Sequence, residues 1–147
     1  MSSDRDRAPP SIEREIAEYA RGTPDVLATW LFGSRAEGPG TRLSDLDVAF
    51  LLDEAPGTDL FERRLALRAD LAERLRTDAL DVVVLNGAPV GLRFTIVRRG
   101  RLLFCRDELA RIRFEADARS RWFDMEPFRS VLARGLQRRL AEESFGR

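Results

Sequence analysis

Apolar positions along the chain follow two patterns, and each pattern predicts a different kind of element. Behind Ser11, a good helix N-cap, apolar residues return every three or four positions, with Ile12 and Ile16 on one face, as in an amphipathic helix. Residues 45–52 instead end in five consecutive apolar side chains, as expected for a central strand. The full pattern predicts helices over residues 11–21, 59–76, 90–99, 107–123 and 127–143, strands over residues 26–32, 45–52, 80–85 and 101–105, and a short helix over residues 34–37.

The alternation of these strands and helices predicts an α/β or α+β fold. A length of 147 residues fits one domain with its own core. We expect residues 1–10 to be a disordered tail and residues 11–147 to form a single domain, with C-terminal helices from about residue 107. Most large apolar side chains of these last helices should belong to the core rather than to an interface. They are Leu109, Ile112, Phe114, Trp122, Phe123, Phe128, Val131, Leu132 and Leu136.

Two residue types that commonly carry catalysis are missing from the sequence. There is no histidine, and all 25 basic residues are arginine. These absences exclude Ser-His-Asp and Cys-His catalysis, histidine-ligated zinc, and the lysines of phosphate-binding loops or Schiff bases. The single cysteine, Cys105, lies in an apolar run, which predicts a structural thiol and a reducing compartment such as the cytoplasm. No apolar run approaches the ~18 residues of a membrane helix.

Charge is divided unevenly along the chain, although the formal net charge is zero. Residues 1–89 carry 17 acidic and 11 basic groups, a net charge of −6. Residues 90–147 carry 8 acidic and 14 basic groups, a net charge of +6. The arginines of the second half either solvate helical faces or form a basic surface for a triphosphate, an acidic partner or nucleic acid.

One stretch combines a small-residue turn with paired carboxylates. Gly33 and Ser34 follow the first predicted strand, and Asp45 and Asp47 come after ten intervening residues. Side chains two positions apart in a strand point to the same face, so these two carboxylates should lie close together. They would repel each other unless a divalent cation binds them, and their hard oxygen ligands favour Mg²⁺. Asp81 lies near the start of another apolar strand and supplies a third carboxylate.

The same stretch offers groups that bind phosphate. Gly33 would let the backbone approach a triphosphate closely, and the hydroxyl of Ser34 can donate to a phosphate oxygen. Arg35 and Arg42 flank the motif and would contact the triphosphate or remain solvent-exposed. Nucleotidyl transfer needs charge neutralisation and in-line positioning, which two metal ions can provide. The predicted catalytic and metal-binding residues are therefore Asp45, Asp47 and Asp81, and the predicted nucleotide-binding residues are Gly33, Ser34, Arg35 and Arg42.

At these residues the chain resembles the nucleotidyltransferase superfamily with the DNA polymerase β-like fold. The signature of that family is Gly-Ser, about ten residues, Asp-x-Asp, and a third acid on a later strand. The match is closest to the minimal nucleotidyltransferase (MNT) group, and the stretches L-D-V-V-V-L-N-G-A-P and F-C-R-D-E-L-A-R-I-R-F-E-A-D-A-R-S-R-W-F-D-M-E-P-F-R are also similar to that group. The resemblance covers roughly residues 12–135 and implies a small mixed β-sheet flanked by helices.

The resemblance also implies an activity. Members of the MNT group are often antitoxins of HEPN-domain toxins and transfer AMP from ATP to a tyrosine hydroxyl of the toxin, releasing pyrophosphate. On that pattern Asp45 and Asp47 bind two Mg²⁺ ions, Asp81 completes the site and helps to deprotonate the acceptor, and Gly33 and Ser34 hold the triphosphate. A hetero-oligomer with the toxin is then expected. Selection of ATP over other nucleotides comes from the family alone.

The sequence also allows other functions. The chain could modify a small molecule such as an aminoglycoside, although enzymes of that kind usually carry an additional substrate domain. It could also be a binding module without catalysis, whose helical tail masks a toxin. Template-free polymerisation of nucleic acid is not favoured, because no separate nucleic-acid-binding domain is visible.

Overall fold

The computed structural model describes residues 11–33 and 45–145 of the chain. The predicted tail over residues 1–10 and the predicted short helix over residues 34–37 lie outside the described residues. No helix within the described residues combines the length and the apolar character needed to cross a membrane.

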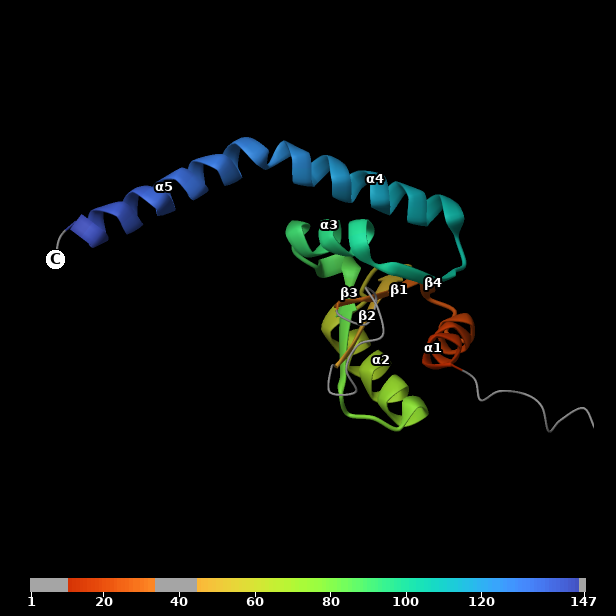
Figure 1. Cartoon of the computed structure of the whole chain (residues 1–147). Coiled ribbons are helices and arrows are strands. Elements are labelled where there is room, and N and C mark those ends of the chain that lie inside the picture. Colours follow the sequence, from red (N-terminus) through yellow and green to blue (C-terminus); the bar gives the residue numbers. More distant parts are fainter. Residues whose placement is uncertain (1–10, 34–44, 146–147) are drawn as a thin grey trace, which may run out of the picture.

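A mixed four-stranded sheet in the order β3-β2-β1-β4 forms the centre of the molecule (Figure 1). The strands are β1 (Val26–Phe32), β2 (Leu46–Leu52), β3 (Leu80–Val84) and β4 (Arg101–Cys105). Strand β1 pairs antiparallel with both β2 and β4, whereas β2 and β3 are parallel and are joined by the helix α2 (Leu60–Leu75). A parallel pair needs such a crossover, because a tight turn reverses the chain and joins only antiparallel strands.

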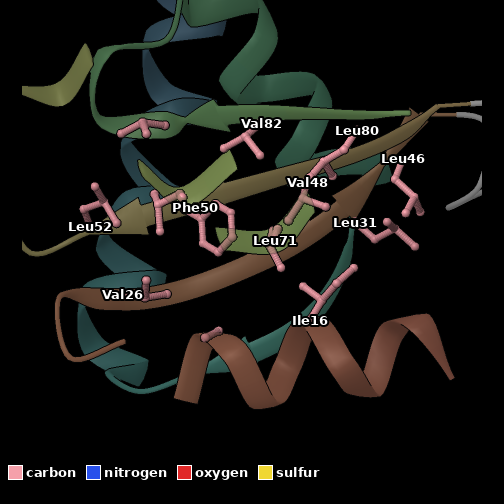
Figure 2. Packing of buried hydrophobic residues seen from close by; sticks show 13 residues of the cluster. Ile16, Val26, Leu31, Leu46, Val48, Phe50, Leu52, Leu71, Leu80 and Val82 are labelled. Carbon is pink, nitrogen blue, oxygen red and sulfur yellow. The ribbon is translucent and has the colours of Figure 1, made fainter. Parts of the chain in front are cut away.

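Helix α1 (Ile12–Arg21) and α2 cover one face of this sheet. Ile16 of α1 and Leu71 of α2 are fully buried against apolar side chains of the strands (Figure 2). Leu67 of α2 is fully buried in the same cluster. Both helices begin at the residues that the sequence indicated, because Ser11 accepts from the N–H of Arg14 and Asp59 accepts from the first turn of α2. This face holds the larger of the two apolar clusters.

The other face is covered by α3 (Val90–Arg99) and, beyond it, α4 (Glu108–Asp124). Ile96 of α3 is fully buried against this face. Trp30 of β1 lies with its ring centroid 6.0 Å from that of Phe114, which belongs to α4. A short 3-10 turn, η2 (Leu85–Gly87), connects β3 to α3. The predicted α/β or α+β class with a small mixed sheet is therefore confirmed.

The C-terminal helices correct one expectation. Helix α5 (Glu126–Phe145) extends away from the sheet as an arm, continuing the line of α4 (Figure 1). Phe114 and Trp122 are partly buried, but the other apolar side chains expected in the core are exposed, with exposed fractions from 51% for Ile112 to 63% for Leu136. They are Leu109, Ile112, Phe123, Phe128, Val131, Leu132 and Leu136. The prediction that most of them are core was wrong, because, within the described residues, α5 packs mainly against the end of α4 and is exposed from Val131 to Ser144. Leu109, Ile112 and Phe123 of α4 are exposed as well.

Candidate active site

Three strands begin or finish at the same end of the sheet and bring the predicted acidic residues together. Strand β1 ends there, and β2 and β3 begin there, as Leu31, Leu46 and Leu80 show in Figure 2. In the register of the sheet, Asp47 lies opposite Phe32 on one side and opposite Asp81 on the other. Residues that pair across a sheet point to the same face, so the carboxylates of Asp47 and Asp81 are neighbours.

The acidic side chains influence one another electrostatically. Asp47 is partly buried, and its pKa is raised first by this burial and then by the negative charges of Asp81 and Asp45. Both causes act in the same direction, because a carboxylate in a less polar setting and beside like charges holds its proton more tightly. Asp45 precedes β2 and is exposed, as is Asp81. The structure therefore brings all three predicted aspartates to one place.

Gly33 lies directly against this acidic cluster. Its φ angle of +78° is in the left-handed region that favours glycine, and a β-carbon placed on it would lie 3.1 Å from Cγ of Asp47 and closer still to the carboxylate oxygen. Any side chain at residue 33 would have to displace the Asp47 carboxylate. Glycine at this position thus keeps the backbone next to Asp47, and its approach to a triphosphate stays a prediction.

The start of β3 is held by contacts that sequence reasoning did not identify. Arg68 of α2 donates from Nε to the carbonyl of Leu80, at 3.2 Å, and from Nη2 to the carbonyl of Asp78, at 3.1 Å. The N–H of Leu46 donates to the carbonyl of Ala79 at 2.9 Å. These bonds fix the three residues that precede Asp81. An arginine within an amphipathic helix carries no sequence signal for such a role.

The other predicted site residues, Ser34, Arg35 and Arg42, lie outside the described residues. Among residues 11–33 and 45–145, no group of three or more acidic, histidine or cysteine side chains has an arrangement that could already hold a metal ion. Asp45, Asp47 and Asp81 nevertheless interact through their charges. Carboxylates that repel one another in the absence of a cation are expected to stay apart. Their oxygen atoms are the kind of ligand that Mg²⁺ prefers, so the three residues fit this ion in chemistry.

Comparison with known proteins defines the class of this site. The Polymerase beta, Nucleotidyltransferase family matches residues 14–109, which contain every strand of the sheet and all three aspartates. The chain belongs to this family and is a nucleotidyltransferase. No curated protein matches the chain.

Solved structures extend the similarity beyond the sheet. A toxin–antitoxin complex with AMP-PNP is 26% identical, with a TM-score of 0.72, and the match covers 85% of this chain and 98% of that chain. A variant of the MntA–HpeT toxin–antitoxin is 25% identical over the same shares, also with a TM-score of 0.72. The MNT antitoxin complex with a tri-AMPylated Shewanella oneidensis HEPN toxin has the same fold, at 24% identity, a TM-score of 0.67, and coverage of 86% and 96%. The chain is thus similar to MNT antitoxins over nearly their whole length.

Proposed function

We propose that this nucleotidyltransferase transfers AMP from ATP to a hydroxyl, for which tyrosine is the expected residue, of a HEPN-domain toxin, and that it acts as the antitoxin of that toxin. The observation that carries the proposal is that Gly33, Asp47 and Asp81 lie together at one end of the sheet. Two further points support it. A relative that is 26% identical was solved with the ATP analogue AMP-PNP. Another carries replacements of two aspartates by glutamate at the same i, i+2 spacing as Asp45 and Asp47.

Each residue of the site has a proposed role in the reaction. Asp45, Asp47 and Asp81 would hold Mg²⁺, which would neutralise the triphosphate and the charge that develops on it. Gly33 leaves room for the phosphates beside Asp47, and Ser34, Arg35 and Arg42 are proposed to contact the triphosphate. The acceptor oxygen forms a bond to the α-phosphorus, the bond from that phosphorus to the bridging oxygen breaks, and pyrophosphate leaves. The hydroxyl proton passes to the carboxylate of Asp81.

A second candidate function has an observation in its favour. The exposed apolar side chains of α5 could bind and mask a toxin without any chemistry. Modification of a small molecule has no comparable support within the described residues. The cytoplasm as the compartment of the protein stays a prediction from its single cysteine.

Intact mass measurement distinguishes these functions. The purified chain is incubated with ATP, Mg²⁺ and the product of the neighbouring gene, and in parallel with an aminoglycoside. We expect that product to be a HEPN-domain protein and to gain the mass of one or more AMP groups. A stable complex with no change in mass would support masking, and modification of the aminoglycoside alone would support the small-molecule reading.

Variants connect this activity to the site. Asp45→Asn and Asp47→Asn should each reduce the transfer rate by at least about a hundredfold, because each removes a carboxylate that holds the metal, while circular dichroism remains unchanged. Asp53→Asn is the matched control, since Asp53 is an exposed acid just past the opposite end of β2. Normal transfer by either of the first two variants would contradict the assignment of the site.

A further inference from the structure

An apolar groove runs beside β3, within two residues of the acidic cluster. It has a volume of about 220 Å³ and lies between the first turn of α2, the strand β3 and the first turn of α3. Its walls include Leu60, Phe61, Val83, Ala88 and Leu92. Sites for small molecules usually measure ~300–1,000 Å³, so this groove is better matched to a single apolar side chain of a larger partner.

The groove and Asp81 share one strand, and one wall of the groove lies on the face of Asp81. Val83 follows Asp81 by two positions, so both side chains point toward the α3 side of the sheet, whereas Leu60 and Phe61 come from α2 on the other side. At the ~3.3 Å rise per residue of a parallel strand, the Cα atoms of Asp81 and Val83 lie about 7 Å apart. An extended segment that runs along β3 would therefore reach both the groove and the carboxylate of Asp81.

The order of the strands separates the two substrates. Gly33 follows β1, on one side of Asp47, whereas Asp81 belongs to β3, on the other side. A triphosphate held beside Gly33 occupies the β1 side of the site. The acceptor must then approach from the β3 side, and this is the side on which the groove lies.

The rim of the groove has the composition of a protein-binding surface. Phe61 is a large apolar residue that is 59% exposed. The guanidinium carbon of Arg64 lies 5.8 Å from the centre of this ring. Exposed aromatic residues and arginines are enriched among the residues that contribute most to protein–protein binding.

We propose that this groove binds an apolar side chain of the acceptor protein, on the segment that carries the modified hydroxyl. The inference rests on the proposed transfer of AMP to a protein. In an extended segment, side chains two positions apart lie on the same face and about 7 Å apart, the same spacing as Val83 and Asp81. The apolar residue therefore stands two positions from the acceptor residue in the sequence of the acceptor protein.

Kinetics with the acceptor protein that the mass measurement identifies test the groove. We expect Phe61→Ala to raise the KM for this acceptor at least about tenfold, with kcat and the KM for ATP within about twofold of the wild type. Leu65→Ala is the matched control, because Leu65 lies one turn further along α2, is 44% exposed and does not line the groove. An unchanged KM in Phe61→Ala, or an equal rise in Leu65→Ala, overturns the proposal.

A double-mutant cycle tests the spacing. Once mass spectrometry has located the modified residue, the apolar residue two positions from it is replaced by alanine in the acceptor. This replacement should raise the KM of the wild-type enzyme by a similar factor and add little to the KM of Phe61→Ala, because both changes remove the same contact. Independent, multiplying effects overturn the proposal. If the wild-type enzyme transfers no AMP to the acceptor, the proposed function itself fails, which is a different result from transfer that ignores Phe61.

Discussion

Gly33 is the residue whose identity the structure constrains most directly. Gly33→Ala should reduce nucleotidyl transfer by at least about tenfold, because the added methyl group would occupy the place of the Asp47 carboxylate and force it to move. Stability should fall only by about 1–2 kcal/mol, the usual cost of a left-handed conformation for an L-residue. Transfer assays and thermal melts measure the two effects separately.

The chain contains a matched control for this substitution. Gly57 has a similar φ angle of +85°, but nothing lies within 4 Å of the position that its β-carbon would take. Gly57→Ala therefore introduces comparable backbone strain without a collision. We expect it to lower the melting temperature by a similar amount and to leave transfer unchanged. Equal losses of activity in both variants would mean that strain, rather than contact with Asp47, explains the effect.

The acidic cluster should lower the stability of the metal-free protein. The raised pKa of Asp47 means that its ionised form is less stable in the folded chain than in the unfolded chain, so its charge opposes folding at pH 7. We expect Asp47→Asn to raise the melting temperature at pH 7 in the presence of EDTA, because the variant lacks this charge. The gain should shrink when Mg²⁺ is added, since a cation removes the same repulsion from the wild type. A lower melting temperature in EDTA would contradict this reading.

At the scale of elements, the sequence pattern was informative wherever one side of an element is buried. Helix α2 was predicted over residues 59–76 and is found over Leu60–Leu75, since Asp59 caps its start. The helix predicted over residues 90–99 is found as α3, with Ile96 buried against the sheet. Local periodicity and capping carry this information because they depend on near neighbours in sequence.

Pairing between elements could not be derived in the same way. The aspartate spacing placed Asp45 and Asp47 together, but only the parallel register of β2 and β3 places Asp81 opposite Asp47. Register depends on contacts between residues far apart in sequence, and a single pattern does not encode it. The exposure of α5 was missed for the same reason, because an apolar row on a helix indicates a covering partner without showing whether that partner is part of the same chain.

Arg106 joins several elements and offers a prediction at this scale. Its guanidinium donates to the carbonyls of Val26 at 3.0 Å, Ala20 at 3.1 Å and Arg21 at 2.7 Å, which ties the end of α1 and the start of β1 to the end of β4. Arg106→Met keeps most of the side-chain volume and loses these bonds. We expect a loss of about 1–2 kcal/mol in the free energy of unfolding, measured by denaturant titration. Arg113→Met, at an exposed position of α4, should change it by less than about 0.5 kcal/mol.

Across the whole molecule, the sheet with its helices α1 to α4 (the body) and helix α5 (the arm) differ in what they contribute to stability. The first turn of α5 is attached, because the guanidinium of Arg129 donates to the carbonyl of Trp122 at 2.9 Å and lies over the ring of the same residue. Every described side chain from Val131 to Ser144 is exposed. Burial of apolar surface supplies most of the free energy that favours folding, so this part of the arm should add almost nothing to the stability of the body.

Two truncations test this division. A chain that ends at Ser130 keeps Arg129 and should melt within about 2 °C of the full chain, because it loses no buried side chain. A chain that ends at Asp107 also loses α4, and with it the contacts of Phe114 with Trp30 and of Trp122 with Phe94. It should melt far lower or fail to fold, since it uncovers one face of the sheet. If removal of residues 131–147 instead lowered the melting temperature steeply, α5 would have to pack against the body in solution, and its apolar row would already be covered by this chain.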